Sequence, residues 1–592
     1  MKTLRFSKIA LVAIFGLISY ACQDSFLEKP ALGALSDAQL NTKAGVQNLL
    51  VGAYAALDGN GVGAASAWDA AADNWIYGSI AGGDAKKGSD GADQALINSI
   101  MIYSADPSNG FFNSKWKAVY EGINRANTVL KFLPLVTSGM TDAEKTSVAA
   151  QARFLRGHYY FELKKMFNMV PWVDENTPDP AAVPNDKDIW LNIEDDFRFA
   201  MENLPATQAE VGRVNKWAAA AYLAKTFLYE KKYNEAKTTF DQVLAQGVTS
   251  NGLKYDLLPR FQDNFDAAKK NLAESVFAIQ MAANDGTNTI DNANTGGMLN
   301  FPYNSPFRCC GFFQPSVDLA NSFQTDASGL PKVNNYNSTT LKNDMGVESK
   351  SPFTPDVTVA LDPRIDWTVG RRGIPFLDWG NHPGQSWIRL QSYAGPYSPK
   401  KNMYWQATKD VYSDQHSWAP GTAINVQVIR FADVLLMAAE AEAQLNNLAK
   451  AQEYVNRVRA RAAKPESWVY TYADASKPMG GFTKTPAANY KITEYPTGAF
   501  AAKGKEGALA AIYFERKLEL AMEGHRFFDL SRWGVAEQTL NAYIAFEGKI
   551  TPDVRGGKFR KNLNEYYPIP QQQIDLSTKN GASSLKQNPG YQ

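Results

Sequence analysis

Cysteine and histidine are scarce in this chain of 592 residues, which holds three cysteines and four histidines. The histidines lie far apart in the sequence, and no cysteine–histidine cluster has the spacing of a zinc site. The sequence also contains no phosphate-binding P-loop, no GxSxG motif and no dinucleotide-binding glycine fingerprint. The motifs therefore predict no reaction, and we expect no catalytic residue, no metal and no cofactor.

The chain has no excess of charge of either sign. Lysine and arginine total 61 and aspartate and glutamate total 60, which gives a formal net charge of +1. Nucleic-acid-binding proteins usually carry a pronounced basic patch, so we expect no nucleic-acid partner. Aromatic content, at 12%, is generous. Aromatic rings serve large helical cores as well as sugar-binding surfaces, and the count leaves both roles open.

The apolar run near the N-terminus is too short to cross a membrane. It extends over the ten residues from Ile9 to Ile18, whereas a membrane-spanning helix needs about 20. Three basic residues precede this run, at Lys2, Arg5 and Lys8. A basic region followed by a short apolar run is typical of a secretory signal peptide.

Cys22 follows the apolar run in the sequence Ser19-Tyr20-Ala21-Cys22. A small residue before a cysteine at this point is typical of a bacterial lipoprotein signal, although serine stands where leucine is more usual. We therefore expect cleavage before Cys22 and lipid attachment to it, with residues 1–21 as signal peptide and 22–42 as lipidated tether. An ordinary secretory signal with a chance cysteine is the alternative.

Apolar residues recur at helical spacing along much of the chain. The pattern predicts amphipathic helices over residues 43–57, 111–133 and 143–169. Helix–turn–helix pairs are predicted over residues 213–246 and 430–461, and both resemble tetratricopeptide hairpins. We expect a mainly α fold built on such hairpins.

Glycine, proline and asparagine interrupt the helical pattern in residues 58–95, 248–425 and 463–505. Long loops in compact proteins are often functional. We expect short β segments and loops in residues 248–425. Binding specificity usually resides in an irregular segment of this kind that is held by a rigid helical frame. We divide the mature chain into an N-terminal helical half, 43–247, and a C-terminal half, 248–592, which includes this irregular segment.

Charged and aromatic side chains are densest in residues 511–534. Treated as one helix, this stretch predicts an apolar face formed by Phe514, Leu518, Ala521 and Phe528. A stripe of carboxylates lies beside that face, formed by Glu515, Glu519 and Glu523. Matching cations are supplied by Arg516, Arg526 and Arg532. We expect a buried or half-buried ion-pair network. A metal site formed by these glutamates with His525 and Asp529 is the alternative, which the arginines disfavour.

Several blocks of sequence resemble one known family. They are ERKLELAMEGHRFFDLSRWG at 515–534, INRAN at 123–127, FLRGHYYFELKKMF at 154–167, LDPRID at 361–366, IRFADVLLMAAEA at 429–441, and YPIP and QNPGY near the C-terminus. Together with the start CQDSFLEKP, they are similar to the SusD/RagB family of outer-membrane nutrient-binding lipoproteins of Bacteroidetes. The resemblance covers essentially the whole mature chain and implies the SusD-like fold.

The resemblance implies a role in nutrient uptake. Such a protein is anchored by lipid in the outer membrane at the cell surface, captures an oligosaccharide without turnover, and delivers it to a SusC-like TonB-dependent transporter. A peptide in place of the glycan, as inferred for RagB-like members, is the first alternative. A surface glycosidase with paired carboxylates and a purely structural adaptor are the others.

Candidate ligand-binding residues are chosen by residue type and by their place in predicted loops. Aromatic rings cover the apolar faces of sugars, and amide or guanidinium groups bond to hydroxyl groups. The candidates are Trp68, Asn74, Trp75, Tyr303, Arg308, Trp379 and Trp387. The alternative for each of these residues is a purely structural role.

Cys309 and Cys310 are adjacent in the irregular segment. Adjacent cysteines can close a vicinal disulfide, but most neighbouring pairs do not. We therefore expect two ordinary thiols.

Overall fold

The computed structural model describes residues 37–60 and 66–591. Cys22, the predicted signal peptide and most of the predicted tether lie outside the described residues. Within the described ranges, no helix combines the length and apolar character needed to cross a membrane.

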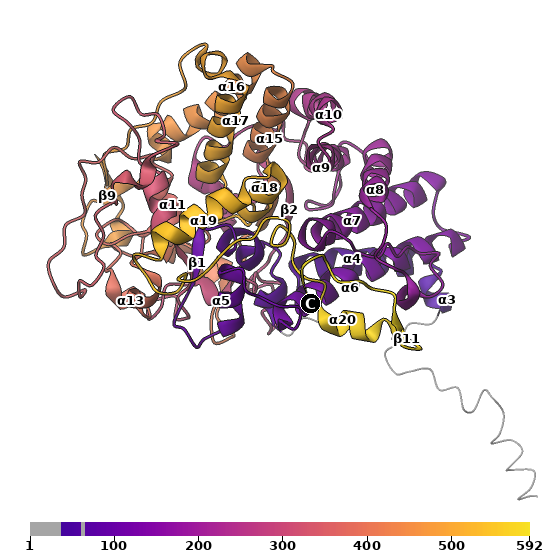
Figure 1. Ribbon diagram of the computed structural model, residues 1–592. Coiled ribbons are helices and arrows are strands. Elements are labelled where there is room, and N and C mark those ends of the chain that lie inside the picture. The colour runs from indigo at the N-terminus through magenta and orange to yellow at the C-terminus, as the bar shows by residue number, and fades with distance from the viewer. Residues whose placement is uncertain (1–36, 61–65, 592) are drawn as a thin grey trace, which may run out of the picture.

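Helices dominate the first part of the chain and return after the irregular segment, which confirms the predicted mainly α fold (Figure 1). The helices of the first part are α3 (Asp37–Leu40), α4 (Lys43–Ala55), α5 (Ala95–Met101), α6 (Gly110–Phe132), α7 (Asp142–Phe167), α8 (Trp190–Asn203), α9 (Lys216–Tyr229) and α10 (Tyr233–Gln246). The later helices are α15 (Phe431–Gln444), α16 (Leu448–Ala463), α17 (Ala499–Glu519), α18 (Arg526–Trp533), α19 (Ala536–Glu547) and α20 (Gln571–Leu576).

Side-chain caps fix where several of these helices begin. The Thr42 hydroxyl accepts a hydrogen bond from the Gly45 amide at the start of α4. Thr141 and Glu144 form a reciprocal capping box at the start of α7. Such caps satisfy amide groups that the first helical turn leaves without partners.

The helices pack as successive antiparallel neighbours, from α6 through α7, α8 and α9 to α10. Helix α10 then packs against α15, so the two predicted hairpins, α9–α10 and α15–α16, are confirmed and lie side by side. Their small residues allow this close approach, since Ala219, Ala220 and Ala439 are fully buried. The irregular segment therefore leaves and re-enters one continuous stack of helices.

The irregular segment contains short strands, as predicted, and also short helices that the sequence pattern did not predict. The short helices are α11 (Val317–Ser322), α12 (Ile365–Thr368), α13 (Gln391–Ala394) and α14 (Lys409–Tyr412). Among the described residues the strands form two-stranded antiparallel pairs: β1 (Ala85–Gly88) with β3 (Phe312–Pro315), β2 (Ser275–Ile279) with β8 (Val426–Arg430), β4 (Val369–Gly370) with β5 (Ser398–Pro399), β6 (Ser413–Asp414) with β7 (Gly421–Thr422), β9 (Tyr470–Tyr472) with β10 (Phe482–Pro486), and β11 (Thr578–Lys579) with β12 (Ala582–Ser583).

The prediction of a long loop over residues 58–95 is wrong for residues 74–89. Residues 74–89 are buried and form the helical turn η3 (Trp75–Ile80) and strand β1. The Tyr77 hydroxyl donates to two backbone carbonyls, those of Asp69 and Phe111, which ties the segment to the core. Its glycines and alanines permit the backbone to lie against its neighbours and do not signal solvent exposure.

The prediction of one helix over residues 511–534 is also wrong. Helix α17 ends at Glu519 and α18 begins at Arg526, with a turn between them. Gly524 has a φ of 77° in this turn, and a Cβ there would lie 1.9 Å from the Asp73 carbonyl oxygen. The apolar residues Phe514, Leu518 and Phe528 are buried as expected, although they belong to two helices.

The predicted ion-pair network is present, but its cations come from distant segments. Glu519 pairs with Arg364, Arg430 and Arg461, and Glu515 pairs with Arg364 and Arg459. The predicted partners Arg516 and Arg532 instead pair with other carboxylates, including Asp529. The LDPRID block supplies Asp362 and Arg364 to this network. Its arginines occupy the carboxylates that the alternative metal site would need.

The C-terminal segment returns to the first helices. Helix α20 lies beside α6, where Asn113 donates to Gln572. The Asn588 amide group donates to the Phe167 carbonyl at the end of α7. The last residues therefore complete the packing of the first half of the fold.

Candidate functional site

Two loops of the irregular segment and one helical turn form the surface region that contains the exposed candidates. The first loop connects Phe301 to Gly311 and carries Tyr303 and Arg308, and the helical turn η2 (Ala67–Ala70) carries Trp68. The second loop follows β6 from Gln415 to Ala419 and carries no residue selected from the sequence. Backbone pairing of Asn294 with Thr422 holds the segments before the first loop and after the second together.

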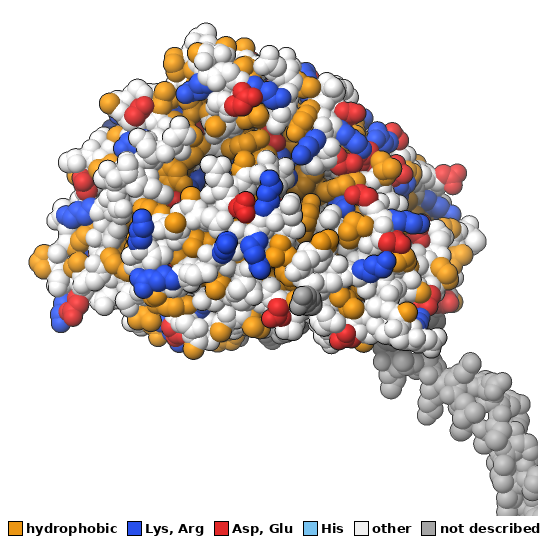
Figure 2. Space-filling view, viewed as in Figure 1, with side chains coloured by type: hydrophobic (Ala, Val, Ile, Leu, Met, Phe, Trp, Pro, Cys, Tyr) orange, Lys and Arg blue, Asp and Glu red, His pale blue; other side chains and the backbone are white. Residues whose placement is uncertain are grey.

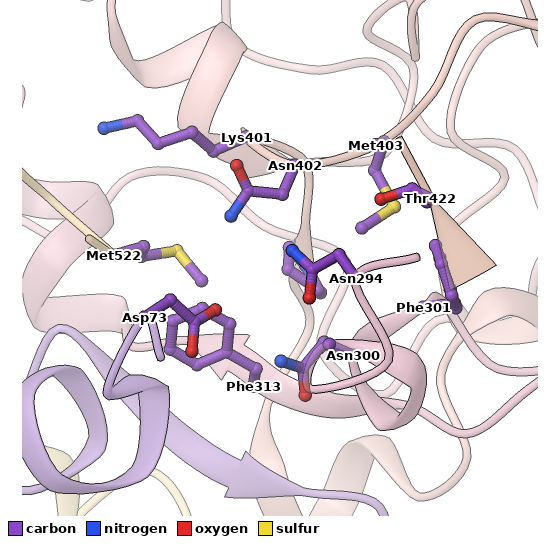
Figure 3. A pocket seen from close by; sticks show the side chains of 12 residues that line it. Asp73, Asn294, Asn300, Phe301, Phe313, Lys401, Asn402, Met403, Thr422 and Met522 are labelled. Atoms are coloured by element: carbon purple, nitrogen blue, oxygen red, sulfur yellow. The ribbon is translucent and has the colours of Figure 1, made fainter. Parts of the chain in front are cut away.

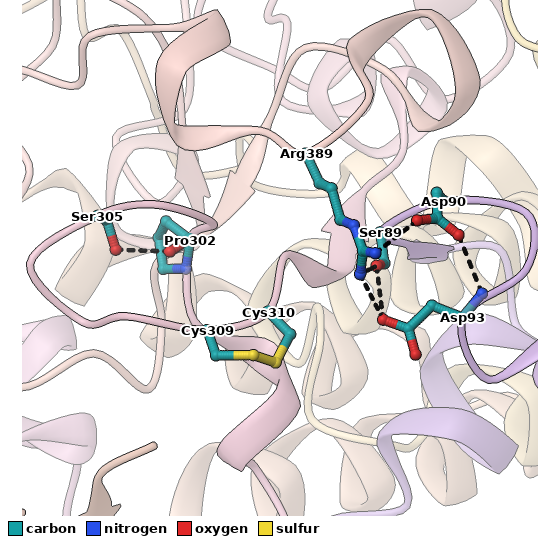
Figure 4. Close-up of a disulfide and its surroundings, with 8 residues drawn as sticks. All are labelled: Ser89, Asp90, Asp93, Pro302, Ser305, Cys309, Cys310 and Arg389. Atoms are coloured by element: carbon teal, nitrogen blue, oxygen red, sulfur yellow. Dashed lines mark hydrogen bonds and ion pairs between the residues drawn. A yellow bond between two sulfur atoms is a disulfide. The ribbon is translucent and has the colours of Figure 1, made fainter. Parts of the chain in front are cut away.

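The first loop is closed at its base. Phe301 bridges Cys310, and the Gly311 amide donates to the Phe301 carbonyl at 2.8 Å. Cys309 and Cys310 are joined by a vicinal disulfide, so the expectation of two ordinary thiols is wrong (Figure 4). The folded loop keeps both sulfur atoms together, which the sequence does not reveal because most adjacent cysteines stay unpaired.

Tyr303 and Arg308 stand on this closed loop. Tyr303 is 37% exposed, and the Arg389 guanidinium lies 5.6 Å from its ring centroid. Arg389 is itself held by ion pairs to Asp90 and Asp93 (Figure 4). The exposed Arg308 donates to the Ser417 carbonyl at 2.9 Å and to the Gln415 side-chain oxygen at 2.7 Å, which ties the first loop to the second.

Trp418 continues the surface on the second loop. It is 50% exposed, and its ring meets Trp68 edge to face at 6.0 Å between centroids. We name the surface formed by Trp68, Tyr303, Arg308 and Trp418 the aromatic rim. It combines exposed rings with hydrogen-bonding groups, the combination that sugar recognition requires.

Trp379 and Trp387 lie beneath the rim. Both rings contact Phe307, a buried residue of the first loop. The Trp379 indole nitrogen donates to the Tyr404 carbonyl at 2.8 Å. Both tryptophans are half-buried, so they support the loop that carries Tyr303 and Arg308.

Asn74 and Trp75 are not available at the surface, which corrects their selection as ligand contacts. Trp75 is 1% exposed, and its indole nitrogen donates to the Gly296 carbonyl. Asn74 is 5% exposed and donates to the Glu162 carboxylate at 2.9 Å. Both belong to residues 74–89, which are buried although their glycine-rich sequence is typical of a loop.

A small cavity with a mixed polar and apolar lining lies between residues of the irregular segment, Asp73 and Met522 (Figure 3). Its lining includes Asp73, Asn294, Asn300 and Asn402, and its volume is about 30 Å³. Such a volume holds water and not a sugar ring. Burial raises the pKa of Asp73 to about 6, so this carboxyl group is the titratable member of the cavity near neutral pH.

A larger groove of about 470 Å³ lies on α6, away from the rim residues. Tyr120, Asn124 and Leu576 are among the residues that line it. The Tyr120 hydroxyl is already bonded to the Pro171 carbonyl. No residue predicted from the sequence to bind ligand lines this groove.

Sequence reasoning missed Trp418 and Arg389. Trp418 lies in SDQHSWAPG, a short run with polar residues, a proline and a glycine inside the irregular segment. A tryptophan in a run of this composition is the signal by which the sequence could have indicated an exposed aromatic ring. Arg389 has no comparable signal, because only the fold brings it to Tyr303.

Charged side chains of both signs are interspersed on the face of the molecule drawn in Figure 2. Hydrophobic side chains show between them and line a hollow near the upper centre of this view. The mixture on this face agrees with the near-neutral composition.

Two family models match the chain. The model described as "SusD family" matches residues 273–591, more than half of the chain, and the model described as "Starch-binding associating with outer membrane" matches residues 26–228. The chain belongs to the SusD family. The sequence resemblance is thereby confirmed, while the domain boundaries predicted above stay predictions.

Relatives of known sequence or structure agree with this assignment. The chain is 24% identical to a SusD-like protein of Bacteroides ovatus over 481 residues, which cover 78% of this chain and 77% of the relative. A SusD superfamily protein from Bacteroides vulgatus superposes with a TM-score of 0.64 at 21% identity, covering 93% of this chain and 99% of the other. Surface glycan-binding protein A from Bacteroides thetaiotaomicron in complex with laminarihexaose gives a TM-score of 0.61 at 21% identity, covering 92% and 99%. These structural likenesses establish the SusD-like fold.

Proposed function

We propose that this SusD family protein binds an oligosaccharide at the cell surface and delivers it to a SusC-like TonB-dependent transporter of the outer membrane. Lipid on Cys22 anchors it in that membrane, and binding involves no turnover of the ligand. The observation that carries the proposal is the aromatic rim, whose exposed rings of Trp418 and Tyr303 stand on closed loops above a rigid helical frame. The laminarihexaose complex of a structural neighbour supports a glycan as the ligand class.

The proposed contacts follow from the chemistry of the rim. The faces of Trp418 and Tyr303 would cover the apolar C–H faces of successive sugar rings. Arg308 would donate to sugar hydroxyl groups from a guanidinium that is already oriented by Ser417 and Gln415. Pre-orientation of this kind lowers the entropy cost of binding.

The test is isothermal titration of the chain from residue 23 onward against a panel of neutral and acidic oligosaccharides and peptides. Trp418→Ala is expected to weaken binding of the preferred oligosaccharide about tenfold, which equals about 1.4 kcal/mol, because it removes a stacking surface. Tyr566→Ala is the matched control, since Tyr566 is an aromatic residue of similar exposure (39%) outside the rim.

Three outcomes would redirect the proposal. Heat with peptides alone would favour the peptide-carrying alternative. Release of new reducing ends during the titration would indicate a glycosidase. A loss of affinity in Asn124→Ala with unchanged affinity in Trp418→Ala would move the site to the groove on α6.

A further inference from the structure

Arg308 is an exposed cation that the rim leaves without charge compensation. Its hydrogen-bond partners, the Ser417 carbonyl and the Gln415 side-chain oxygen, are both neutral. No carboxylate of the described ranges lies in ion-pair contact with it, whereas the neighbouring Arg389 is paired with both Asp90 and Asp93. Positive charge is therefore concentrated on Arg308.

The Arg308 guanidinium retains donors for a ligand. A guanidinium carries five N–H groups in a planar fork, and the two contacts to the second loop use two of them. The remaining donors match the two oxygens of a carboxylate, which arginine often binds in a bidentate manner. A carboxylate would also supply the charge that the neutral partners do not.

The backbone holds Arg308 in an uncommon conformation. Its φ is 78°, in the left-handed region that long side chains seldom occupy. The Arg308 amide donates to the Ser305 carbonyl, and the disulfide of Cys309 with Cys310 follows directly. Residues held in such conformations concentrate at ligand sites, because the surrounding structure must compensate for their cost.

Asp414 of β6, the acid directly before the second loop, forms no ion pair with Arg308. It is 1% exposed and accepts a hydrogen bond from the amide of His416, whose ring nitrogen Nδ1 also lies 2.6 Å from it. The His416 side chain is 56% exposed. The solvent-facing side of the second loop thus presents an imidazole and an indole.

We propose that the rim selects oligosaccharides that carry carboxylate groups, with Arg308 binding the carboxylate while Trp418 and Tyr303 stack on the sugar rings. This inference rests on the proposed function and adds the substrate class: uronate-containing glycans. Arg308 is the specificity-determining residue, and neutral glycans of the same linkage bind more weakly.

The test compares matched pairs of ligands by isothermal titration of the chain from residue 23. Each pair is a neutral hexasaccharide and the same hexasaccharide oxidised at C6 to uronate, prepared for a β-1,3-glucan, a β-1,4-glucan and an α-1,4-galactan. In at least one pair the uronate form is expected to bind about tenfold more tightly, because a bidentate charged contact is added. Higher salt concentration should reduce that ratio.

Arg308→Gln is expected to bring the ratio close to one, because the uronate ligand loses much more affinity than the neutral ligand, and Arg308→Lys should keep part of the preference. Arg457→Gln, at an arginine outside the rim that pairs with Asp256, is the control and should keep the full ratio. Equal affinity for both members of every pair, or a ratio unchanged in Arg308→Gln, overturns the inference and leaves glycan binding intact. Silence with all six ligands contradicts both the inference and the proposed glycan site.

Discussion

Glu519 is the carboxylate with the most arginine partners in the ion-pair network of the described residues. Its carboxylate lies within ion-pair distance of Arg364, Arg430 and Arg461, and its side chain is fully buried. Burial alone would raise the pKa of Glu519, but the three arginines hold it well below its usual range. The carboxylate therefore remains ionised inside the protein and compensates charges that have no access to water.

Replacing Glu519 by alanine is expected to destabilise the protein by about 3–5 kcal/mol, because it leaves buried arginines without a partner. Urea unfolding followed by circular dichroism measures this change. Glu453→Ala is the control, since Glu453 forms an exposed pair with Lys450, worth at most about 1 kcal/mol. Similar effects for the two substitutions would show that the network contributes little.

Two buried histidines make the free energy of unfolding depend on pH in the mildly acidic range. Burial lowers the pKa of His158 to about 4 and that of His382 to about 3. A lowered folded-state pKa gives stability that is fully present above the unfolded value, about 6.5, and is lost as the pH falls toward the folded value.

His158 alone is expected to lower the free energy of unfolding by on the order of 3 kcal/mol between pH 6.5 and pH 4. Buried carboxyl groups with a raised pKa, such as Asp73, act in the opposite direction over this range. The contribution of His158 is therefore measured as the difference in pH dependence between the wild type and His158→Gln, by urea unfolding at a series of pH values. The same pH dependence in both proteins would exclude this contribution.

At the scale of elements, Gly524 allows two segments that are far apart in the sequence to pack backbone against backbone. The turn between α17 and α18 lies directly against the segment that contains η3, so that a Cβ on Gly524 would approach the Asp73 carbonyl to 1.9 Å. A Cβ on Gly78 would reach the Gly524 carbonyl oxygen at 1.8 Å. Two backbones in such contact leave no room for side chains.

Gly524→Ala is expected to destabilise the protein by several times more than Gly534→Ala. Both glycines have a φ in the left-handed region, near 77° and 74°, but a Cβ on Gly534 meets no atom within 4 Å. The control substitution thus carries only the conformational cost, about 1 kcal/mol. Thermal unfolding of both variants checks the difference, and equal shifts would show that the close approach relaxes at no cost.

Helices with a regular apolar stripe could be predicted from the sequence, whereas turns and closely packed backbone segments could not. Helical periodicity located α4, α6, α7 and both hairpins, because a regular apolar stripe follows directly from the helix repeat. It failed at residues 511–534, where the end of α17 and the whole of α18 continue the same pattern across a turn. It also failed at residues 74–89, where small residues serve close backbone packing and not exposure.

At the scale of the whole molecule, the family could be identified from the sequence, whereas the ligand-binding residues stay a prediction. Arg308 and Tyr303 were selected by residue type, and the structure keeps both at the surface. Trp418, which is 50% exposed, was not selected, and Trp75, which was selected, is 1% exposed. Exposure depends on contacts between residues far apart in sequence, such as Trp75 with Gly296, and local composition does not encode them.

The return of the C-terminal segment has a consequence for how the chain matures. The Tyr567 hydroxyl donates to the Tyr77 carbonyl across 490 positions of sequence, and its ring packs against Phe112. Contacts of such long range form slowly, because a large loop must close first. A chain that is synthesised from its N-terminus would therefore keep the core around Tyr77 incomplete until its last residues are available to fold.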